Sequence, residues 1–227
     1  MRFVLASASP RRKELFSLTG WEAEISPASI PEAKDSAEDA GGYVTRLAAQ
    51  KAQFAAEQRM DTEPAVILGA DTIVYFEEKI LEKPADDKHA RIMLKMLSGK
   101  THQVCTAISV LDLRHKTATS CACVTQVPMR NYSDQEIDRY IETGSPLDKA
   151  GAYGIQDREF EPVEVKKMDG CFANVMGLPL CHLVVQLGRI GIRTEADVPA
   201  ACQQYNAYNC PVFASILGGE PCVEPRL

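Results

Sequence analysis

Several features that mark common protein classes are missing from this sequence of 227 residues. No apolar run approaches the roughly 20 residues of a membrane span, and residues 1–9 are too short and too strand-like for a signal peptide. The 25 Lys and Arg residues are outnumbered by 31 Asp and Glu residues, so the chain lacks the basic excess of a nucleic-acid-binding protein. We therefore expect a cytoplasmic protein that binds neither nucleic acid nor membrane.

Common catalytic and metal-binding motifs are missing as well. The chain has no G-x-S-x-G, Walker A or G-x-G-x-x-G motif, and its four histidines are scattered, so covalent serine or cysteine catalysis and dinucleotide binding are not supported. Eight cysteines are present, but no CxxC pair. Cys121 and Cys123 alternate as on one face of a strand, and Cys202, Cys210 and Cys222 fit no zinc signature. A metal or disulfide role of these last three is the minor alternative.

The remaining sequence predicts an α/β fold with a mixed central sheet and flanking helices, because strand and helix patterns intermix along the chain. The strands expected are residues 2–6, 65–70, 73–76, 80–81, 102–113 and 117–129, with a short one following the loop 148–156. The helices expected are residues 11–18, 43–59, 86–97, 133–143 and one ending near 187. Residues 192–227 lose this periodicity, so we expect a domain at 1–191 and a Cys- and Pro-containing extension at 192–227.

The first candidate site is the start of the first helix. Ser9 is expected at the N-cap and Pro10 at the first helical position. Free N–H groups there bind anions, and Ser7, Arg11 and Arg12 would add bonds to a phosphate chain. An ordinary capped helix is the alternative. However, basic residues at a helix N-terminus oppose the macrodipole, which favours phosphate binding.

Asp71 is the second candidate. It follows the apolar residues 65–70 and precedes the apolar residues 73–76. A carboxylate in such a run is costly to bury unless it is paired or bound to a metal, where it can activate water. The alternative is a strand that ends at Ala70, with Asp71 beginning an exposed turn.

Four other polar residues carry little information by themselves. Lys51 lies on the apolar face of its helix, where its stem could pack while its ammonium reaches water. Lys83 is held extended by Pro84, and Glu32 lies in a polar loop. Gln156 could contact a base edge through its amide donor and acceptor.

Four sequence motifs, LASASPRRKEL, GADTIV, EKP and DKAGAYGIQ, occur in this order, and NVMGLPL follows them. Together they resemble the Maf family of nucleotide pyrophosphatases over about residues 1–190. The resemblance implies two lobes around a deep cleft, akin to the inosine-triphosphatase fold, and often a homodimer. It also implies cleavage of a nucleoside triphosphate to a monophosphate and pyrophosphate with a divalent cation, Mg²⁺ or Mn²⁺.

The resemblance also assigns roles to residues. Asp71 matches the catalytic acidic residue that activates water, and Glu32 matches its acidic partner at the metal. The phosphate-binding set comprises Ser7, Ser9, Arg11, Arg12, Lys51 and Lys83. Arg12, Thr72 and Gln156 match the subgroup that hydrolyses dTTP and UTP, together with some modified pyrimidine triphosphates.

The chain departs from the family pattern after Gln156, where DREFEPVEV replaces the usual Gly-rich connection, and in the extension from residue 192. Three alternatives to the dTTP/UTP prediction remain open. They are a pyrophosphatase for 7-methyl-GTP or a damaged purine nucleotide, a nucleotide-binding regulator of cell division with little turnover, and an interaction module that acts through the extension.

Overall fold

A computed structural model describes residues 1–35, 38–61 and 63–219. Its centre is a six-stranded mixed sheet in the order β2-β1-β3-β5-β6, with β4 paired to the end of β3. The strands are β1 (Arg2–Leu5), β2 (Ala23–Ile25), β3 (Ala65–Phe76), β4 (Lys79–Leu81), β5 (Thr101–Asp112) and β6 (Thr117–Pro128). β1 runs parallel to β2 and β3, whereas β5 runs antiparallel to both of its neighbours, β3 and β6. The predicted mixed α/β fold is confirmed.

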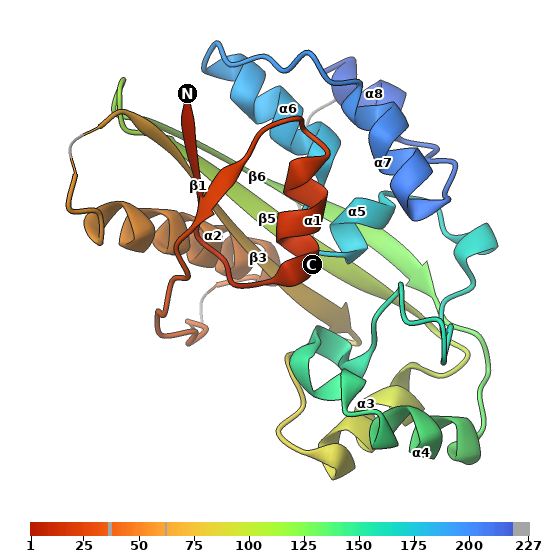
Figure 1. Cartoon of the computed structure of the whole chain (residues 1–227). Helices are drawn as coiled ribbons and strands as arrows, with labels where there is room; N and C mark the ends of the chain where they lie inside the picture. The colour runs from red at the N-terminus through yellow and green to blue at the C-terminus, as the bar shows by residue number, and fades with distance from the viewer. Residues whose placement is uncertain (36–37, 62, 220–227) are drawn as a thin grey trace.

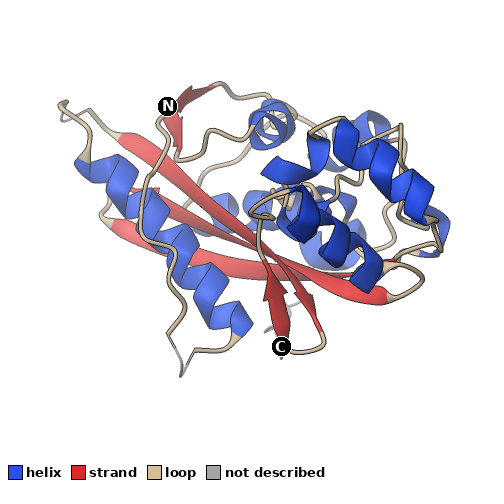
Figure 2. Ribbon diagram, turned by 90° about the horizontal axis from the view of Figure 1, so that it is seen from below, coloured by secondary structure: helices blue, strands red, loops and turns tan. Residues whose placement is uncertain are grey.

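The helices cover both faces of the sheet and one of its ends (Figures 1 and 2). They are α1 (Pro10–Ser17), α2 (Ala40–Glu57), α3 (Asp87–Leu97), α4 (Asp134–Glu142), α5 (Phe172–Val175), α6 (Leu180–Arg189), α7 (Val198–Asn206) and α8 (Phe213–Leu217). α2 packs on one face, and α1, α5 and α6 share a core with the other face. α3 and α4 pack at the far end of the long strands and form a second lobe.

α2 approaches β3 closely at Gly69. A Cβ atom at this position would lie 2.0 Å from the Ala48 carbonyl oxygen and 2.7 Å from the Ala52 nitrogen, so only glycine fits. Ala48, Lys51 and Ala52 share the buried side of α2. The close contact therefore places Lys51 directly over the middle of β3.

The middle of β3 has a free edge, and this edge produces the cleft. β1 pairs with β3 only as far as Leu5 opposite Leu68, and β4 begins pairing at Val74. Between these points, residues 69–73 pair with β5 on one side and with none of the described strands on the other. Because successive strand residues point to opposite faces, Asp71 and Thr72 reach this opening from opposite sides of the sheet.

Three local expectations were wrong or incomplete. β3 is continuous through Asp71 and Thr72, so the alternative of an exposed turn at Asp71 is excluded. The loop 148–156 leads into no strand in the described structure; instead a 3₁₀ turn at Ser145–Asp148 precedes it and a second one lies within it at Ala150–Ala152. Ser9 occupies the N-cap of α1, but its side chain makes no capping hydrogen bond.

Much of the extension is folded onto the main core. Val198 in α7 is 1% exposed, and Ile192 also belongs to the core shared by α1, α5 and α6. α7 and α8 pack against α6. Cys202 and Cys210 are free and half-buried here, while Cys222 lies outside the described residues. The domain boundary at residue 191 stays a prediction.

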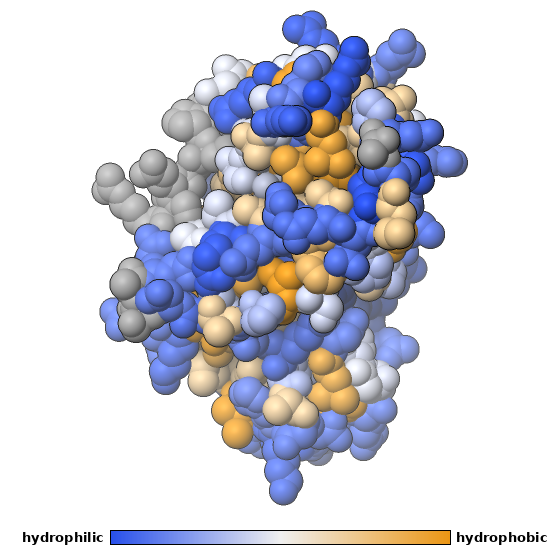
Figure 3. All heavy atoms as spheres, turned by 90° about the vertical axis from the view of Figure 1, so that its left-hand side faces the viewer, coloured by the Kyte–Doolittle hydropathy of each residue, from blue (hydrophilic) through white to orange (hydrophobic). Residues whose placement is uncertain are grey.

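The surface shows apolar side chains only in separated patches on the face drawn in Figure 3. Among the described helices, none has both the length and the apolar character needed to cross a membrane.

Candidate active site

A cleft of about 710 Å³ lies between the two lobes at the free edge of β3. Its walls come from the start of α1, from α2, from the middle of β3 and from the turns that follow α4. All the residues singled out from the sequence line it: Ser7, Ser9, Arg11, Arg12, Glu32, Lys51, Asp71, Thr72, Lys83 and Gln156. The structure therefore brings together one set of acidic, basic and hydroxyl side chains from six separate segments.

An ion-pair cluster of Lys51, Asp71 and Glu32 occupies the α2 side. The Lys51 ammonium lies 2.5 Å from Asp71 Oδ1 and 2.7 Å from Glu32 Oε1. The side chains of Lys51 and Asp71 are only 11% and 10% exposed, whereas that of Glu32 is 52% exposed. One cation therefore draws together two carboxylates that would otherwise repel each other.

Asp71 combines burial with charge stabilisation. Burial raises the pKa of Asp71, and the charge and hydrogen bond of Lys51, together with the charge of Arg12, oppose that rise without cancelling it. Among the described contacts, Asp71 Oδ2 has no protein partner, so this oxygen can accept a hydrogen from water. A buried carboxylate with a raised pKa and a free oxygen is suited to general-base catalysis.

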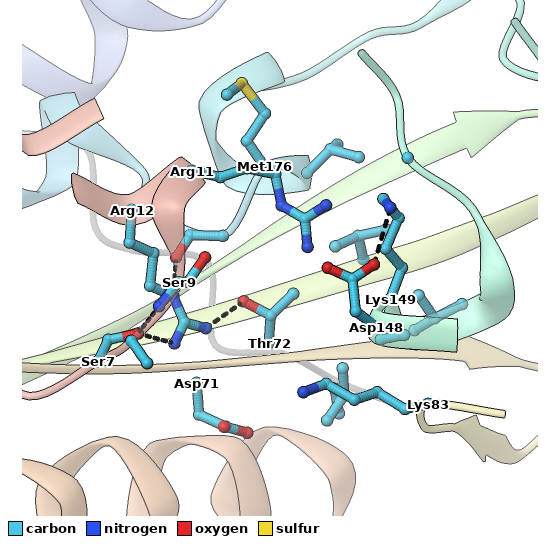
Figure 4. Close-up of a pocket in the computed structure, with 18 of the residues that line it drawn as sticks. Ser7, Ser9, Arg11, Arg12, Asp71, Thr72, Lys83, Asp148, Lys149 and Met176 are labelled. Carbon is cyan, nitrogen blue, oxygen red and sulfur yellow. Dashed lines mark hydrogen bonds and ion pairs between the residues drawn. The ribbon is translucent and has the colours of Figure 1, made fainter. Parts of the chain in front are cut away.

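The opposite side of β3 is organised around Arg12 (Figure 4). Its guanidinium donates to the Gly177 carbonyl at 2.9 Å, to Thr72 Oγ1 at 3.0 Å and to Ser7 Oγ at 3.2 Å. These bonds use only part of its five N–H donors. Burial lowers the pKa of Arg12, an effect that the charge of Asp71 opposes. Arg12 is therefore fixed in orientation while it keeps donors for a ligand.

A chain of hydroxyl groups fixes Thr72 in turn. Thr72 Oγ1 lies 2.9 Å from Thr106 Oγ1, and Thr106 donates to the Asn174 carbonyl at 2.8 Å. Because each hydroxyl carries one hydrogen, Thr72 must donate to Thr106 and accept from Arg12. The hydrogen bonds therefore run in one direction, from Arg12 to the backbone of α5.

The start of α1 lies at the cleft with Ser9 at the N-cap and Pro10 at the first helical position, as predicted, and its role in anion binding stays a prediction. The Ser9 side chain makes no capping hydrogen bond. Instead, the backbone N–H of Ser9 donates to Ser7 Oγ at 3.2 Å. No acidic residue lies in the first turn. The first turn of α1 lines the cleft together with Arg11 and Arg12, an arrangement of the kind that binds phosphate oxygens in other helices.

Asp148 and Lys149 are charged residues of the cleft that the sequence analysis missed. The buried Lys149 ammonium donates to the Ser145 carbonyl at 2.5 Å and to Asp148 Oδ1 at 2.8 Å. Burial would raise the pKa of Asp148, but the hydrogen bond from Lys149 and the charges of Lys149, Arg11 and Lys83 outweigh it and lower that pKa. Their position inside the DKAGAYGIQ motif was the available signal.

Figure 4 shows the arrangement of these groups. Asp71 points toward α2, and Arg12 and Thr72 lie on the other side of β3. Arg11 and Lys83 extend into the space between the lobes, near Asp148. The cleft thus offers an acidic pocket at its floor and cationic groups on the walls, an arrangement suited to a polyphosphate.

The donor set at Asp71 and Glu32 fits a hard divalent cation that arrives with phosphate. Carboxylate oxygens are the ligands that Mg²⁺ and Mn²⁺ prefer, and Mg²⁺ commonly uses one or two carboxylates together with substrate phosphates. Within the described ranges, no cluster of three or more His, Cys, Asp or Glu side chains could hold a metal alone. The two carboxylates thus fit a cation that phosphate oxygens also coordinate.

Known proteins resemble this chain closely. Relatives named dTTP/UTP pyrophosphatase come from Hahella chejuensis, at 43% identity over 86% of this chain and 96% of theirs, and from Geobacter sulfurreducens, at 44% over 84% and 97%. Another, from Escherichia coli, is 46% identical over 78% of this chain and 86% of its own.

A solved Mycobacterium abscessus structure, titled nucleoside-triphosphatase / dITP/XTP pyrophosphatase, covers 91% of this chain and 94% of its own at 13% identity. Its TM-score of 0.40 is too low to bear on function. The family model described as a Maf-like protein matches residues 2–190. The names of the relatives agree with the activity and subgroup predicted from the sequence, and the match over residues 2–190 shows that this chain belongs to the Maf family.

Proposed function

We propose that this protein hydrolyses dTTP and UTP, and related modified pyrimidine triphosphates, to the nucleoside monophosphate and pyrophosphate with the help of a divalent cation. The observation that carries the proposal is the buried Asp71–Lys51–Glu32 cluster, which faces a cleft lined by a helix N-terminus and several cations. The relatives' names support the choice of substrate.

The basic groups have the task of binding the triphosphate. The first turn of α1 provides N–H donors, and Ser7 and Ser9 provide hydroxyls at the same place. Arg11, Arg12 and Lys83 supply positive charge along the walls, which favours a polyanion and stabilises the charge that develops on the leaving pyrophosphate. Lys51 acts mainly by fixing the two carboxylates beneath.

Asp71 has the task of activating water. Its free carboxylate oxygen would orient a water molecule and accept its proton as the water attacks the α-phosphorus. The P–O bond to the leaving pyrophosphate breaks, and the pyrophosphate departs toward the cationic wall. The charge and hydrogen bond of Lys51 oppose the rise in the pKa of Asp71 that burial causes, which favours the ionised form.

Asp71 and Glu32 would hold the divalent cation, which when bound neutralises phosphate charge and lowers the pKa of bound water. Glu32 is well placed because Tyr43 anchors its loop. The Tyr43 hydroxyl lies 3.0 Å from the Glu32 carbonyl oxygen.

Arg12, Thr72 and Gln156 are proposed to select the base. Gln156 lines the cleft beyond the 3₁₀ turns, and its amide can both donate to and accept from a pyrimidine edge. Arg12 and Thr72 are fixed by hydrogen bonds, which suits residues that discriminate between similar ligands.

The proposal also includes a catalytic domain at residues 1–191, a cytoplasmic location and a homodimer. The seven described cysteines are all free thiols, which suits a reducing compartment. Gel filtration with light scattering tests the homodimer directly.

A substrate panel tests the activity. The purified protein is incubated with dTTP, UTP, CTP, GTP, 7-methyl-GTP and dITP, with Mg²⁺, Mn²⁺ or EDTA, and the products are separated. Monophosphate and pyrophosphate from dTTP and UTP, lost with EDTA, are expected. Preference for 7-methyl-GTP would contradict the base assignment, and binding without turnover would favour the regulator.

A further inference from the structure

A tight turn carries Gln156 at the cleft. The backbone N–H of Asp157 donates to the Gly154 carbonyl at 3.2 Å, so residues 154–157 form a β-turn with Ile155 and Gln156 in its middle. Gly154, Gln156 and Asp157 all line the cleft. The position of the Gln156 amide therefore depends on what holds the two ends of this turn.

Tyr140 of α4, in the second lobe (Figure 1), contacts both ends of the turn. Its buried hydroxyl accepts the Gly154 N–H at 3.1 Å and donates to Asp157 Oδ2. A phenol has one hydrogen and an ionised carboxylate can only accept, so each of these bonds has one possible direction. Burial, the bond to Asp157 and the charge of Asp157 all raise the pKa of Tyr140, which keeps the phenol neutral and its hydrogen in place.

The carboxylate of Asp157 is held from a second direction. Ser145 Oγ donates to the same oxygen, Asp157 Oδ2, at 2.9 Å and accepts from the Lys149 ammonium at 2.8 Å. Lys149 itself lies 3.6 Å from Asp157 Oδ2. The carboxylate can lie against the turn because Gly154 has no side chain: a Cβ atom there would be 2.6 Å from Asp157 Oδ1. α4 and the 3₁₀ turn that follows it therefore hold one carboxylate together.

We propose that Tyr140 and Asp157 are positioning residues that clamp the turn carrying Gln156, and that the second lobe thereby takes part in base discrimination. This inference rests on the proposed role of Gln156. Uracil and thymine present an O4 acceptor where cytosine presents an amino donor. An amide on a fixed turn can tell these groups apart, whereas an amide on a loose turn can move to suit either base.

Asp157 also has a particular place in the sequence. It is the first residue of the segment DREFEPVEV, which replaces the Gly-rich connection usual in the family. A Gly-rich connection has no side chain with which to anchor its backbone. The carboxylate of the clamp thus belongs to the part of the chain that departs from the family pattern.

Tyr140→Phe tests the inference, because it removes the hydroxyl and keeps the ring, which stacks on Phe160 with 4.4 Å between the centroids. We expect the ratio of kcat/KM for UTP over CTP to fall about fivefold, the effect of one neutral hydrogen bond. The kcat for UTP should change less than about twofold, since the phosphate-binding residues are untouched. An unchanged ratio would overturn the inference.

Tyr132→Phe is the matched control. Tyr132 contacts the same Phe160 ring, and its hydroxyl donates to the Leu94 carbonyl at 2.6 Å within the second lobe. Each substitution removes one hydrogen-bonded hydroxyl, so both should lower Tm by about 2–4 °C. Only Tyr140→Phe should change the ratio. An equal fall in the control would indicate a general loosening of the lobe and contradict the clamp.

Two substitutions of Asp157 provide a second test with Tyr140 in place. The amide oxygen of Asp157→Asn can still accept from Tyr140 and Ser145, whereas Asp157→Ala has no acceptor. The ratio should fall about fivefold in the alanine variant and stay within about twofold of the wild-type value in the asparagine variant. Equal falls in the two variants would argue against positioning by these hydrogen bonds.

The Gln156→Ala background separates positioning from a structural effect. Tyr140→Phe should cause no further change in the ratio there, because the turn no longer carries an amide. A further change would contradict the inference. If Gln156→Ala alone lowers the ratio, the proposed role of Gln156 survives such a failure. If it does not, the role and the inference fail together.

Discussion

The two faces of β3 bury neighbouring polar residues by different means. On the α2 face, Asp71 is balanced by the charge of Lys51. On the α1 face, Thr72 belongs to a directed chain of neutral hydroxyls that ends on a backbone carbonyl. The ion pair can change its protonation, so it suits proton transfer. The hydroxyl chain fixes only orientation, so it suits recognition.

The strongest test of these different roles of the two faces is the substitution Asp71→Asn. The amide keeps the shape but cannot act as a base, so kcat should fall about 10³-fold with little change in KM. Steady-state kinetics with UTP measure this, and thermal unfolding checks the fold. Asp112→Asn is the control, since Asp112 is a buried strand carboxylate bonded to Arg114 N–H at 2.8 Å, away from the cleft. Near-wild-type turnover would remove Asp71 from catalysis.

Lys51→Met tests the ion pair on the same face of β3 and should lower kcat about 10²-fold. Lys51 lowers the pKa of Asp71 against the effect of burial, so its removal raises that pKa further. The active form of Asp71 is the ionised one, and activity is lost as the pH falls through its pKa. The acid limb of the kcat/KM profile should therefore move to higher pH. An acid limb that does not move would contradict the pairing of Lys51 with Asp71. Lys51→Arg keeps the positive charge, so its acid limb should lie close to the wild-type position.

On the opposite face, Arg12→Lys should affect binding more than turnover. Lysine keeps the charge but cannot make the three bonds to Gly177, Thr72 and Ser7 together. We expect KM for dTTP to rise about tenfold and preference over CTP to weaken, with kcat within about threefold. If kcat fell as far as in the Lys51 variant, the two faces would not differ in role.

The smallest expected effect is that of Thr106→Val, which interrupts the hydroxyl chain behind Thr72. The Asn174 carbonyl keeps the bond from Gly177 N–H but loses the one from the Thr106 hydroxyl, so the free energy of unfolding should fall by about 1 kcal/mol. KM should change less than about threefold, as Arg12 keeps its other bonds. Thr125→Val is the comparison, because the Thr125 hydroxyl does not line the cleft but donates to the Cys171 carbonyl and accepts from Cys171 N–H and Asn174 Nδ2. Equal kinetics in both variants would show that the chain has no role in recognition.

Sequence alone predicted the parts of the fold that depend on local signals. Ser133 and Glu136 form the expected capping box of α4, and Asp86 caps α3. The long strands alternated clearly, and Cys121 and Cys123 share one core as expected. The start of α1 and Asp71 stood out because their residue types conflicted with their local setting.

Long-range contacts were not predictable in this way. A short strand was predicted after the loop 148–156, whereas Ala152 and Tyr153 of this loop are buried against the α3–α4 lobe. Gly151 and Ala152 adopt positive φ, which no strand allows. Only the family resemblance indicated a functional role for Lys51, Glu32 and Gln156. Their local sequence gives no sign of function, because the fold alone brings them to the cleft. The docking of the extension depends on partners such as Thr19 and Glu14, far away in sequence.

Gly69 has a consequence for how this family varies. A side chain at this position would push α2 away from β3 and withdraw Lys51 from Asp71. Natural selection for turnover therefore acts on a residue that has no functional group. We expect glycine here to be as constant among related sequences as Asp71 itself, and any relative with another residue to carry compensating changes at the positions of Ala48 and Ala52.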